Sequence, residues 1–127
     1  MSLDGLRESR RALYRASLYR TCKDLLGYKE MTLATHGGMC EALESATKRK
    51  LIVMPRGTFK SSIGVVGYSV WMLLRNPNLR ILIDSEVYSN SCNFIRELRA
   101  HLVEEKITSL FGDFKTEHNW NAGEFTI

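Results

Sequence analysis

The sequence has few cysteines, few prolines and no long apolar run, and each shortage excludes a class of protein. Its three cysteines, Cys22, Cys40 and Cys92, are widely spaced and form no CxxC pair, which argues against a disulfide framework or a zinc site. Two prolines and nine glycines among 127 residues exclude a collagen-like or low-complexity chain. We therefore expect reduced thiols and one ordinary domain that holds a core without disulfides.

Signals for export and membrane insertion are also lacking. Residues 1–15 are charged where a signal peptide would carry an apolar core. The longest weakly polar run, residues 61–74, is shorter than the roughly 20 residues that span a bilayer. We expect a chain that is neither secreted nor membrane-spanning.

Charge is present in an ordinary amount but is unevenly distributed. Charged residues make up 25% of the chain and hydrophobic residues 44%, with a net charge of +4, as in a soluble globular domain. Residues 1–80 hold 14 basic and 6 acidic residues, net +8, whereas residues 81–127 hold 4 and 8, net −4. Such asymmetry permits a polyanion to bind one face. One interpretation is a non-catalytic nucleic-acid-binding module that uses Arg7, Arg10, Arg11, Arg15 and the run Lys48-Arg49-Lys50; the plainer one is a solvated surface.

Hydrophobic periodicity predicts a helical lead-in over residues 1–47. Apolar residues recur at helical spacing over residues 6–26, and Gly27 is a natural stop. A second, shorter helix is predicted over residues 37–47. The pattern changes at residue 48.

From residue 48 onward, strand and helix patterns alternate. Apolar residues at 51–54 and 79–84 predict two strands, and residues 63–75 between them predict a buried helix. A further helix is predicted from a cap at Ser85 to near Glu105, with a last turn at 107–111 and the start of a strand at 124–127. This order predicts an α/β fold, a P-loop NTPase-type parallel sheet with flanking helices over residues 48–127.

The segment between the first predicted strand and the buried helix has the setting of a phosphate-binding loop. It reads Pro55-Arg56-Gly57-Thr58-Phe59-Lys60-Ser61-Ser62. Backbone N–H groups at a helix N-terminus favour an anion. Lys60 would reach the β- and γ-phosphates of ATP, and the Ser61 hydroxyl would ligate Mg²⁺. The match to GxxxxGK[ST] is imperfect, because Phe59 and Met54 stand where that pattern has glycine.

This loop resembles the deviant Walker A motif of the large terminase subunit of tailed bacteriophages, which is often written Pro-Arg-Gly-x-x-Lys-Ser/Thr. The resemblance extends over about residues 14–127 and includes residues 22–28, His36 with Met39-Cys40, and residues 76–83, 94–97 and 110–114. It implies an ATPase that packages double-stranded DNA into a procapsid. The family's ATPase domain has a parallel α/β P-loop fold and is usually followed by a nuclease domain.

The resemblance also implies roles for single residues. Lys60 would hold the β- and γ-phosphates, and Arg56 would sense or stabilise the γ-phosphate, where an arginine can strongly accelerate phosphoryl transfer. The alternative for Arg56 is a salt bridge that shapes the loop. The other phosphate-binding positions would be Gly57, Thr58, Phe59, Ser61 and Ser62. Upstream candidates for the adenine side are Tyr28, His36 and Met39.

A Walker B element, which is an apolar strand that ends in Asp and is usually followed by Glu, would complete the magnesium site. One segment of the sequence is similar to it. Residues 81–86 end in Asp84-Ser85-Glu86, so that Asp84 could bind the metal and Glu86 could activate water. This is the interpretation of the chain as a small self-contained P-loop NTPase. By the resemblance, the family's Walker B and nuclease carboxylates lie beyond Ile127. Residues 1–127 would then be the N-terminal portion of the ATPase domain, without the nuclease domain.

The resemblance further implies partners and a location. The partners would be double-stranded DNA, the portal protein and the small terminase subunit, and the full-length protein would form a homo-oligomeric ring. The protein would act in the cytoplasm of the infected bacterial host, transiently at the portal of the procapsid, and would have no contact with a membrane.

Overall fold

A computed structural model describes residues 2–114 and 123–124 of the chain. These residues form helices joined by irregular segments. The two elements labelled η are π-helical, with one extra residue in each hydrogen-bonded ring. In chain order the elements are α1 (Leu3–Ala16), α2 (Leu18–Arg20), η1 (Thr21–Leu25), α3 (Leu33–Glu44), η2 (Ser62–Gly67), α4 (Tyr68–Arg75), α5 (Tyr88–Leu102) and α6 (Glu105–Phe111).

The predicted parallel sheet is wrong. Throughout residues 2–114 and 123–124 the backbone forms no strand, and residues 51–54 and 79–84 are irregular segments without a ladder. The predicted strand at 124–127 lies mostly outside the described residues. The α/β P-loop architecture expected for residues 48–127 is therefore replaced by an all-helical arrangement.

The burial of these segments explains the error. Leu51 and Val53 are 88% and 82% exposed, while Ile52 and Met54 pack partly against the core. Leu82 is 91% exposed, whereas Leu79 and Ile83 pack partly against the core. A continuous apolar run indicates a parallel strand only when both of its faces are covered. Here each segment buries one side against helices and has no neighbouring strand.

The predicted helix over residues 6–26 is divided into three pieces. Helix α1 begins earlier, at Leu3, because the Ser2 side chain accepts a hydrogen bond from the Gly5 N–H at 3.1 Å. Ser17 then adopts an extended conformation and ends α1. Its hydroxyl accepts from the Arg20 N–H at 3.2 Å and thereby caps α2. The sequence shows the helical period but not this break, because Ser17 is a cap that periodicity does not detect.

The other predicted helices are present with different ends. Helix α3 begins at Leu33 rather than 37, because the Thr32 hydroxyl accepts from the Thr35 N–H at 3.3 Å. Helix α5 begins at Tyr88 after Val87, so Ser85 is not its cap. The expected last turn is the separate helix α6, which buries Ile107 and Leu110.

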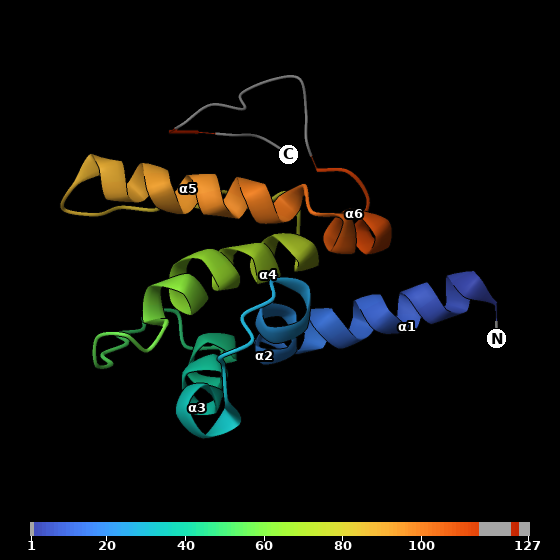
Figure 1. The fold of residues 1–127 in the computed structure, drawn as a ribbon, viewed down its shortest axis with the longest axis horizontal. Helices are drawn as coiled ribbons and strands as arrows, with labels where there is room; N and C mark the ends of the chain where they lie inside the picture. Colours follow the sequence, from blue (N-terminus) through green and yellow to red (C-terminus); the bar gives the residue numbers. More distant parts are fainter. Residues whose placement is uncertain (1, 115–122, 125–127) are drawn as a thin grey trace.

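Figure 1 shows α4 in the middle of the molecule, with α5 on one side and α1, α2 and α3 on the other. The core lies between these layers, and Trp71 of α4 is buried within it, as its apolar helix predicts. The Trp71 indole N–H donates to the carbonyls of Tyr14 and Arg15, at 3.2 and 3.1 Å. The aromatic ring therefore joins α4 to the end of α1. No helix in the described part of the chain is long and apolar enough to cross a membrane.

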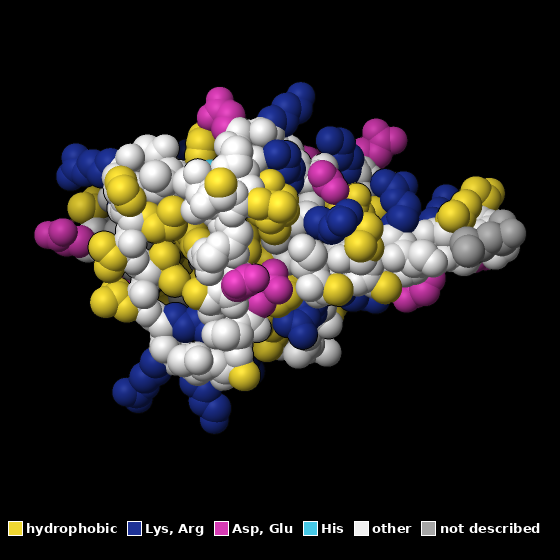
Figure 2. Space-filling view, turned by 90° about the horizontal axis from the view of Figure 1, so that it is seen from below, with side chains coloured by type: hydrophobic (Ala, Val, Ile, Leu, Met, Phe, Trp, Pro, Cys, Tyr) yellow, Lys and Arg dark blue, Asp and Glu magenta, His cyan; other side chains and the backbone are white. Residues whose placement is uncertain are grey.

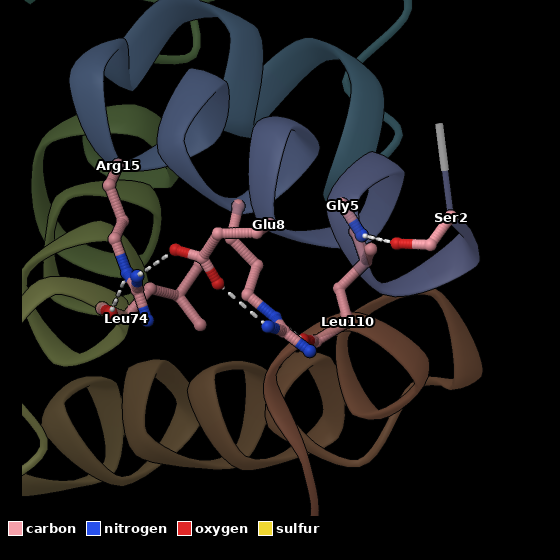
Figure 3. A network of polar contacts seen from close by, with 7 residues as sticks. Ser2, Gly5, Glu8, Arg15, Leu74 and Leu110 are labelled. Atoms are coloured by element: carbon pink, nitrogen blue, oxygen red, sulfur yellow. Dashed lines mark hydrogen bonds and ion pairs between the residues drawn. The ribbon is translucent and has the colours of Figure 1, made fainter.

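Two arginines of α1 bind carbonyls at the ends of other helices (Figure 3). Arg15 Nε donates to the Leu74 carbonyl of α4 at 3.1 Å, and Arg11 Nε donates to the Leu110 carbonyl of α6. Glu8 pairs with both guanidinium groups, at 2.8 Å from Arg11 and 3.8 Å from Arg15. Cations are favourable at helix C-termini, where carbonyl groups lack partners. Part of the basic face predicted for α1 is thus structural.

The π-helical segments η1 and η2 pack against each other. A Cβ atom built on Gly67 of η2 would lie 2.5 Å from Cys22 Sγ of η1 and 3.3 Å from the Ser62 carbonyl oxygen. Such distances leave no space for a side chain. Glycine at position 67 therefore allows this close crossing.

Candidate functional site

The predicted phosphate-binding loop forms a tight turn ahead of a helix. Two of its residues have left-handed backbone conformations, Gly57 with φ of 78° and Phe59 with φ of 58°. The Thr58 hydroxyl donates to the Pro55 carbonyl at 2.6 Å. Helical structure begins at Lys60 and continues through η2 into α4. The first turn of a helix thus follows the loop directly.

Phe59 carries strain that glycine would avoid. For residues with a Cβ atom, the left-handed region costs roughly 1–2 kcal/mol. This is the position at which the usual motif has glycine before the lysine. The mismatch in the sequence therefore marks a real conformational requirement, and it was the signal from which a positive φ at residue 59 could have been predicted.

Lys60 and Ser61 occupy the start of the helix, as the motif requires. The Lys60 ammonium donates to the Met54 carbonyl at 2.9 Å, which ties the start of the helix to the residue just before the loop. Ser61 is exposed. Arg56 is also exposed, and the described residues give it no ion-pair partner, so the alternative of a loop-shaping salt bridge has no support there.

A cavity of about 610 Å³ opens beside Lys60 and Ser61. Its lining combines ammonium groups, hydroxyls and an apolar floor. Lys50 donates to the Leu43 and Ser45 carbonyls at 2.5 and 2.9 Å, and these bonds hold its ammonium group at the end of α3. The residues that line the cavity are Met39, Leu43, Ser45, Thr47, Lys48, Lys50, Ile52, Lys60, Ser61, Gly64, Val65 and Tyr68.

The three adenine-side candidates lie in different places. Met39 lines the cavity that holds Lys60. Tyr28 lines a different cavity of about 270 Å³ together with Phe59, and its hydroxyl is 3.1 Å from His101 Nε2. Burial raises the pKa of Tyr28, and the nearby Cys22, Glu97 and Glu104 raise it further. The three residues therefore do not form one adenine pocket.

His36 contacts the loop itself. Its ring is buried, with 3% of the residue exposed. Nδ1 accepts from the Thr32 N–H at 3.1 Å, and Nε2 lies 2.8 Å from the Thr58 carbonyl oxygen. Because a backbone N–H can only donate, Nδ1 must be unprotonated and Nε2 must carry the proton. His36 is thus a neutral donor to the loop backbone, a role that the sequence did not indicate.

The Walker B-like carboxylates are not part of this site. Asp84 and Glu86 are exposed, and neither lines the cavity that holds Lys60 and Ser61. The Asp84 carboxylate accepts from the Ser85 N–H at 3.0 Å. Within the described residues, no group of three or more His, Cys, Asp or Glu side chains could hold a metal ion.

A second cleft, of about 500 Å³, lies between α1, η1 and α6. Four basic side chains and one carboxylate line it, namely Arg10, Lys23, Lys29, Lys106 and Asp24. On the face shown in Figure 2, basic side chains lie both at the edges and within the face, among hydrophobic and a few acidic side chains.

No known protein family, curated protein or solved structure matches this chain.

Proposed function

We propose that residues 55–62 bind the phosphates of ATP, and that the chain is the nucleotide-binding portion of a packaging ATPase of the terminase type. The observation that carries the proposal is the placement of Lys60 and Ser61 in the first helical turn after a loop with two left-handed residues. A left-handed residue followed by helical residues turns successive N–H groups toward one point, which creates an anion site. The proposal uses this loop and the sequence resemblance, and it requires no sheet.

Each side chain of the loop has a task in this proposal. The Lys60 ammonium exchanges its bond to the Met54 carbonyl for the β- and γ-phosphates. The exposed Arg56 guanidinium neutralises charge on the γ-phosphate. The hydroxyl of Ser61, which is exposed in the same helical turn as Lys60, would hold the magnesium that accompanies the nucleotide.

The residues present suit magnesium bound through a nucleotide. Ser61 offers one exposed hydroxyl, and Mg²⁺ keeps several waters while taking its other ligands from substrate phosphates. The ion would neutralise phosphate charge when bound. Because Asp84 and Glu86 do not line the cavity, we expect nucleotide binding by this chain with little turnover. Double-stranded DNA, the portal protein, the small terminase subunit and a ring of copies are the partners proposed for the complete motor.

The test is a titration of the purified chain with a trinitrophenyl ATP analogue in the presence of Mg²⁺. We expect saturable binding that Lys60→Ala weakens by about tenfold or more, because hydrogen bonds to charged groups contribute roughly 1.5–3 kcal/mol. Arg96→Ala is the control that removes one positive charge elsewhere, since Arg96 is exposed on α5 and lines neither the Lys60 cavity nor the cavities beside Phe59 and α6. Absence of saturable binding in the wild-type chain, or equal affinity of the Lys60 and Arg96 variants, would refute the proposal.

The cleft between α1 and α6 favours a second candidate function, binding of a nucleic-acid backbone. Its four cations outnumber its single carboxylate, and phosphates bind such surfaces with a strong dependence on salt. We expect Lys29→Ala and Lys106→Ala each to reduce the salt dependence of duplex DNA binding by about one ion, measured by fluorescence anisotropy. Lack of DNA affinity even at low salt would exclude this function.

A further inference from the structure

We infer that His36 is a positioning residue for the phosphate-binding loop: its Nε2–H bond to the Thr58 carbonyl holds Phe59 in the left-handed conformation that the anion site needs. The inference rests on the proposed function. It adds the residue that keeps position 59 left-handed where the usual motif relies on glycine. It is carried by the 2.8 Å contact between His36 Nε2 and Thr58 O, the burial of His36, and the φ of 58° at Phe59.

The bond fixes the direction of one peptide group. In a trans peptide the carbonyl of residue 58 and the N–H of residue 59 point in opposite directions. The described residues contain no cis peptide bond. A Thr58 carbonyl that points at His36 therefore turns the Phe59 N–H away from His36. With Phe59 left-handed and Lys60 helical, the N–H groups of residues 59, 60 and 61 form a concave anion-binding nest.

The same peptide has an alternative orientation that would abolish the nest. Rotation of the 58–59 peptide by half a turn changes φ of Phe59 from 58° to about −120°, a negative φ that residues with a Cβ atom adopt without the left-handed strain. That rotation would relieve the strain at Phe59, and the carbonyl would replace the N–H on the concave side. Glycine has no such bias, because it tolerates positive φ. With Phe59 in place, another interaction must favour the orientation in which the Phe59 N–H faces the anion, and the His36 bond acts directly on the carbonyl of that peptide.

The surroundings make His36 a rigid support. It lies in the first turn of α3, where its own N–H donates to the Thr32 carbonyl at 2.8 Å and its Nδ1 accepts from the Thr32 N–H. The Phe59 ring lies 6.4 Å from the His36 ring, centroid to centroid. Thr32 is the cap of α3. The start of α3 therefore holds the ring at a fixed position relative to the loop.

Two substitutions separate this role from packing in the core. In His36→Asn the amide can replace Nδ1 toward Thr32 but cannot reach Thr58. In His36→Gln the amide nitrogen can take the place of Nε2 and donate to Thr58. Phe59→Gly removes the need for the bond altogether. The double variant His36→Asn/Phe59→Gly completes the set, and unfolding curves identify any variant that fails to fold.

The measurement is the affinity for the trinitrophenyl ATP analogue with Mg²⁺. We expect His36→Asn to weaken binding about fivefold, as the loss of one hydrogen bond allows. His36→Gln should bind within about twofold of the wild type, and the double variant within about twofold of Phe59→Gly. If His36 had a purely structural role, His36→Asn would reduce the affinity by the same factor in the wild type and in Phe59→Gly, so that the two losses would multiply in the double variant. Equal loss from His36→Asn in both backgrounds would therefore overturn the inference, and so would equal affinity of His36→Asn and the wild type.

A measurement without ligand keeps the inference separate from the proposed function. The three-bond HN–Hα coupling of residue 59, measured by NMR on labelled protein, reports φ directly. We expect it to rise in His36→Asn, as φ moves from left-handed to extended, and to keep its wild-type value in His36→Gln. An unchanged coupling in His36→Asn overturns the inference. If the wild type binds no nucleotide while the coupling changes as expected, the proposed function fails and the positioning role stands.

Discussion

At the scale of single residues, several basic side chains of this protein bind backbone carbonyls. Lys50 and Lys60 donate to carbonyls at the end of α3 and at Met54, and Arg11 and Arg15 donate to the ends of α6 and α4. Such contacts satisfy groups that helix ends and loops leave without partners. These cations keep their charge, but the carbonyl bonds restrict how far their side chains can move toward a polyanion. The exposed Arg56 is the clearest exception near the loop.

Cys40 provides a prediction at the same scale. Burial raises the pKa of its thiol from 9.0 to about 11, and the charge of Glu44 adds to the effect. The folded protein thus keeps the thiol protonated at a pH where the unfolded chain ionises it. This contribution to stability is complete below about pH 9 and is lost as the pH rises toward 11. The free energy of unfolding should fall over this range, as measured by urea denaturation.

The matched variant for this prediction is Cys40→Ala. Burial also raises the pKa values of Cys22 and Tyr28, so the wild type and the variant will both lose stability at high pH. The variant should lose less of it between pH 9 and 11, because it lacks one of the three groups. Parallel pH profiles for the two proteins would contradict the assignment.

At the scale of elements, helix positions follow from the sequence better than helix ends. The apolar period located the segments that became α1 to α6, and it placed Trp71 correctly in the core. The ends depend on single capping groups, such as the hydroxyls of Ser2, Ser17 and Thr32. A cap acts through one hydrogen bond of about 1 kcal/mol, which a pattern of apolar residues does not register. The π-helical segments η1 and η2 were also beyond prediction, because they arise where two helices cross closely.

The crossing of η1 and η2 gives a prediction for two glycines. Gly67→Ala should destabilise the fold by about 1–3 kcal/mol, because the new methyl group would overlap Cys22 Sγ and press on the Ser62 carbonyl. Gly38→Ala is the control, since Gly38 lies in α3 with no atom within 4 Å of a built Cβ. It should stabilise the helix by up to about 1 kcal/mol. Urea midpoints of the two variants that shift in the same direction would show that the crossing is looser than described.

At the scale of the whole molecule, the sequence was least informative about the arrangement of the segments. The runs at 51–54 and 79–84 are apolar enough for strands, yet Leu51, Val53 and Leu82 face solvent. Whether an apolar run becomes a strand depends on a neighbour to pair with, and pairing is a property of distant segments rather than of the run itself. The alternation of helical and apolar segments was therefore correct as a local pattern and wrong as a topology.

The candidate site was predictable in part for the same reason. The order of loop, Lys60 and helix is local, and it was visible in the motif. The contact of His36 with Thr58, across 22 residues of chain, depends on how α3 packs against the loop. The separation of Tyr28 from Met39 into two cavities is likewise a result of packing. The spacing of these residues along the chain made them candidates, but it could not predict which of them lie close together in the fold.

The π-helical segment η2 links the loop to the core through an unusual register. Lys60 and Ser61 precede it, and Trp71 and Leu74 follow it on the buried side of α4. Deletion of one residue between 62 and 67 would remove the extra residue and leave a regular α-helix with the loop facing nearly as before, but any further insertion or deletion would turn the helix by about 100° per residue. The loop would then face a different direction relative to the core. Homologous proteins that share this loop should therefore tolerate insertions and deletions on either side of residues 60–75 and, within them, only the loss of one residue between 62 and 67.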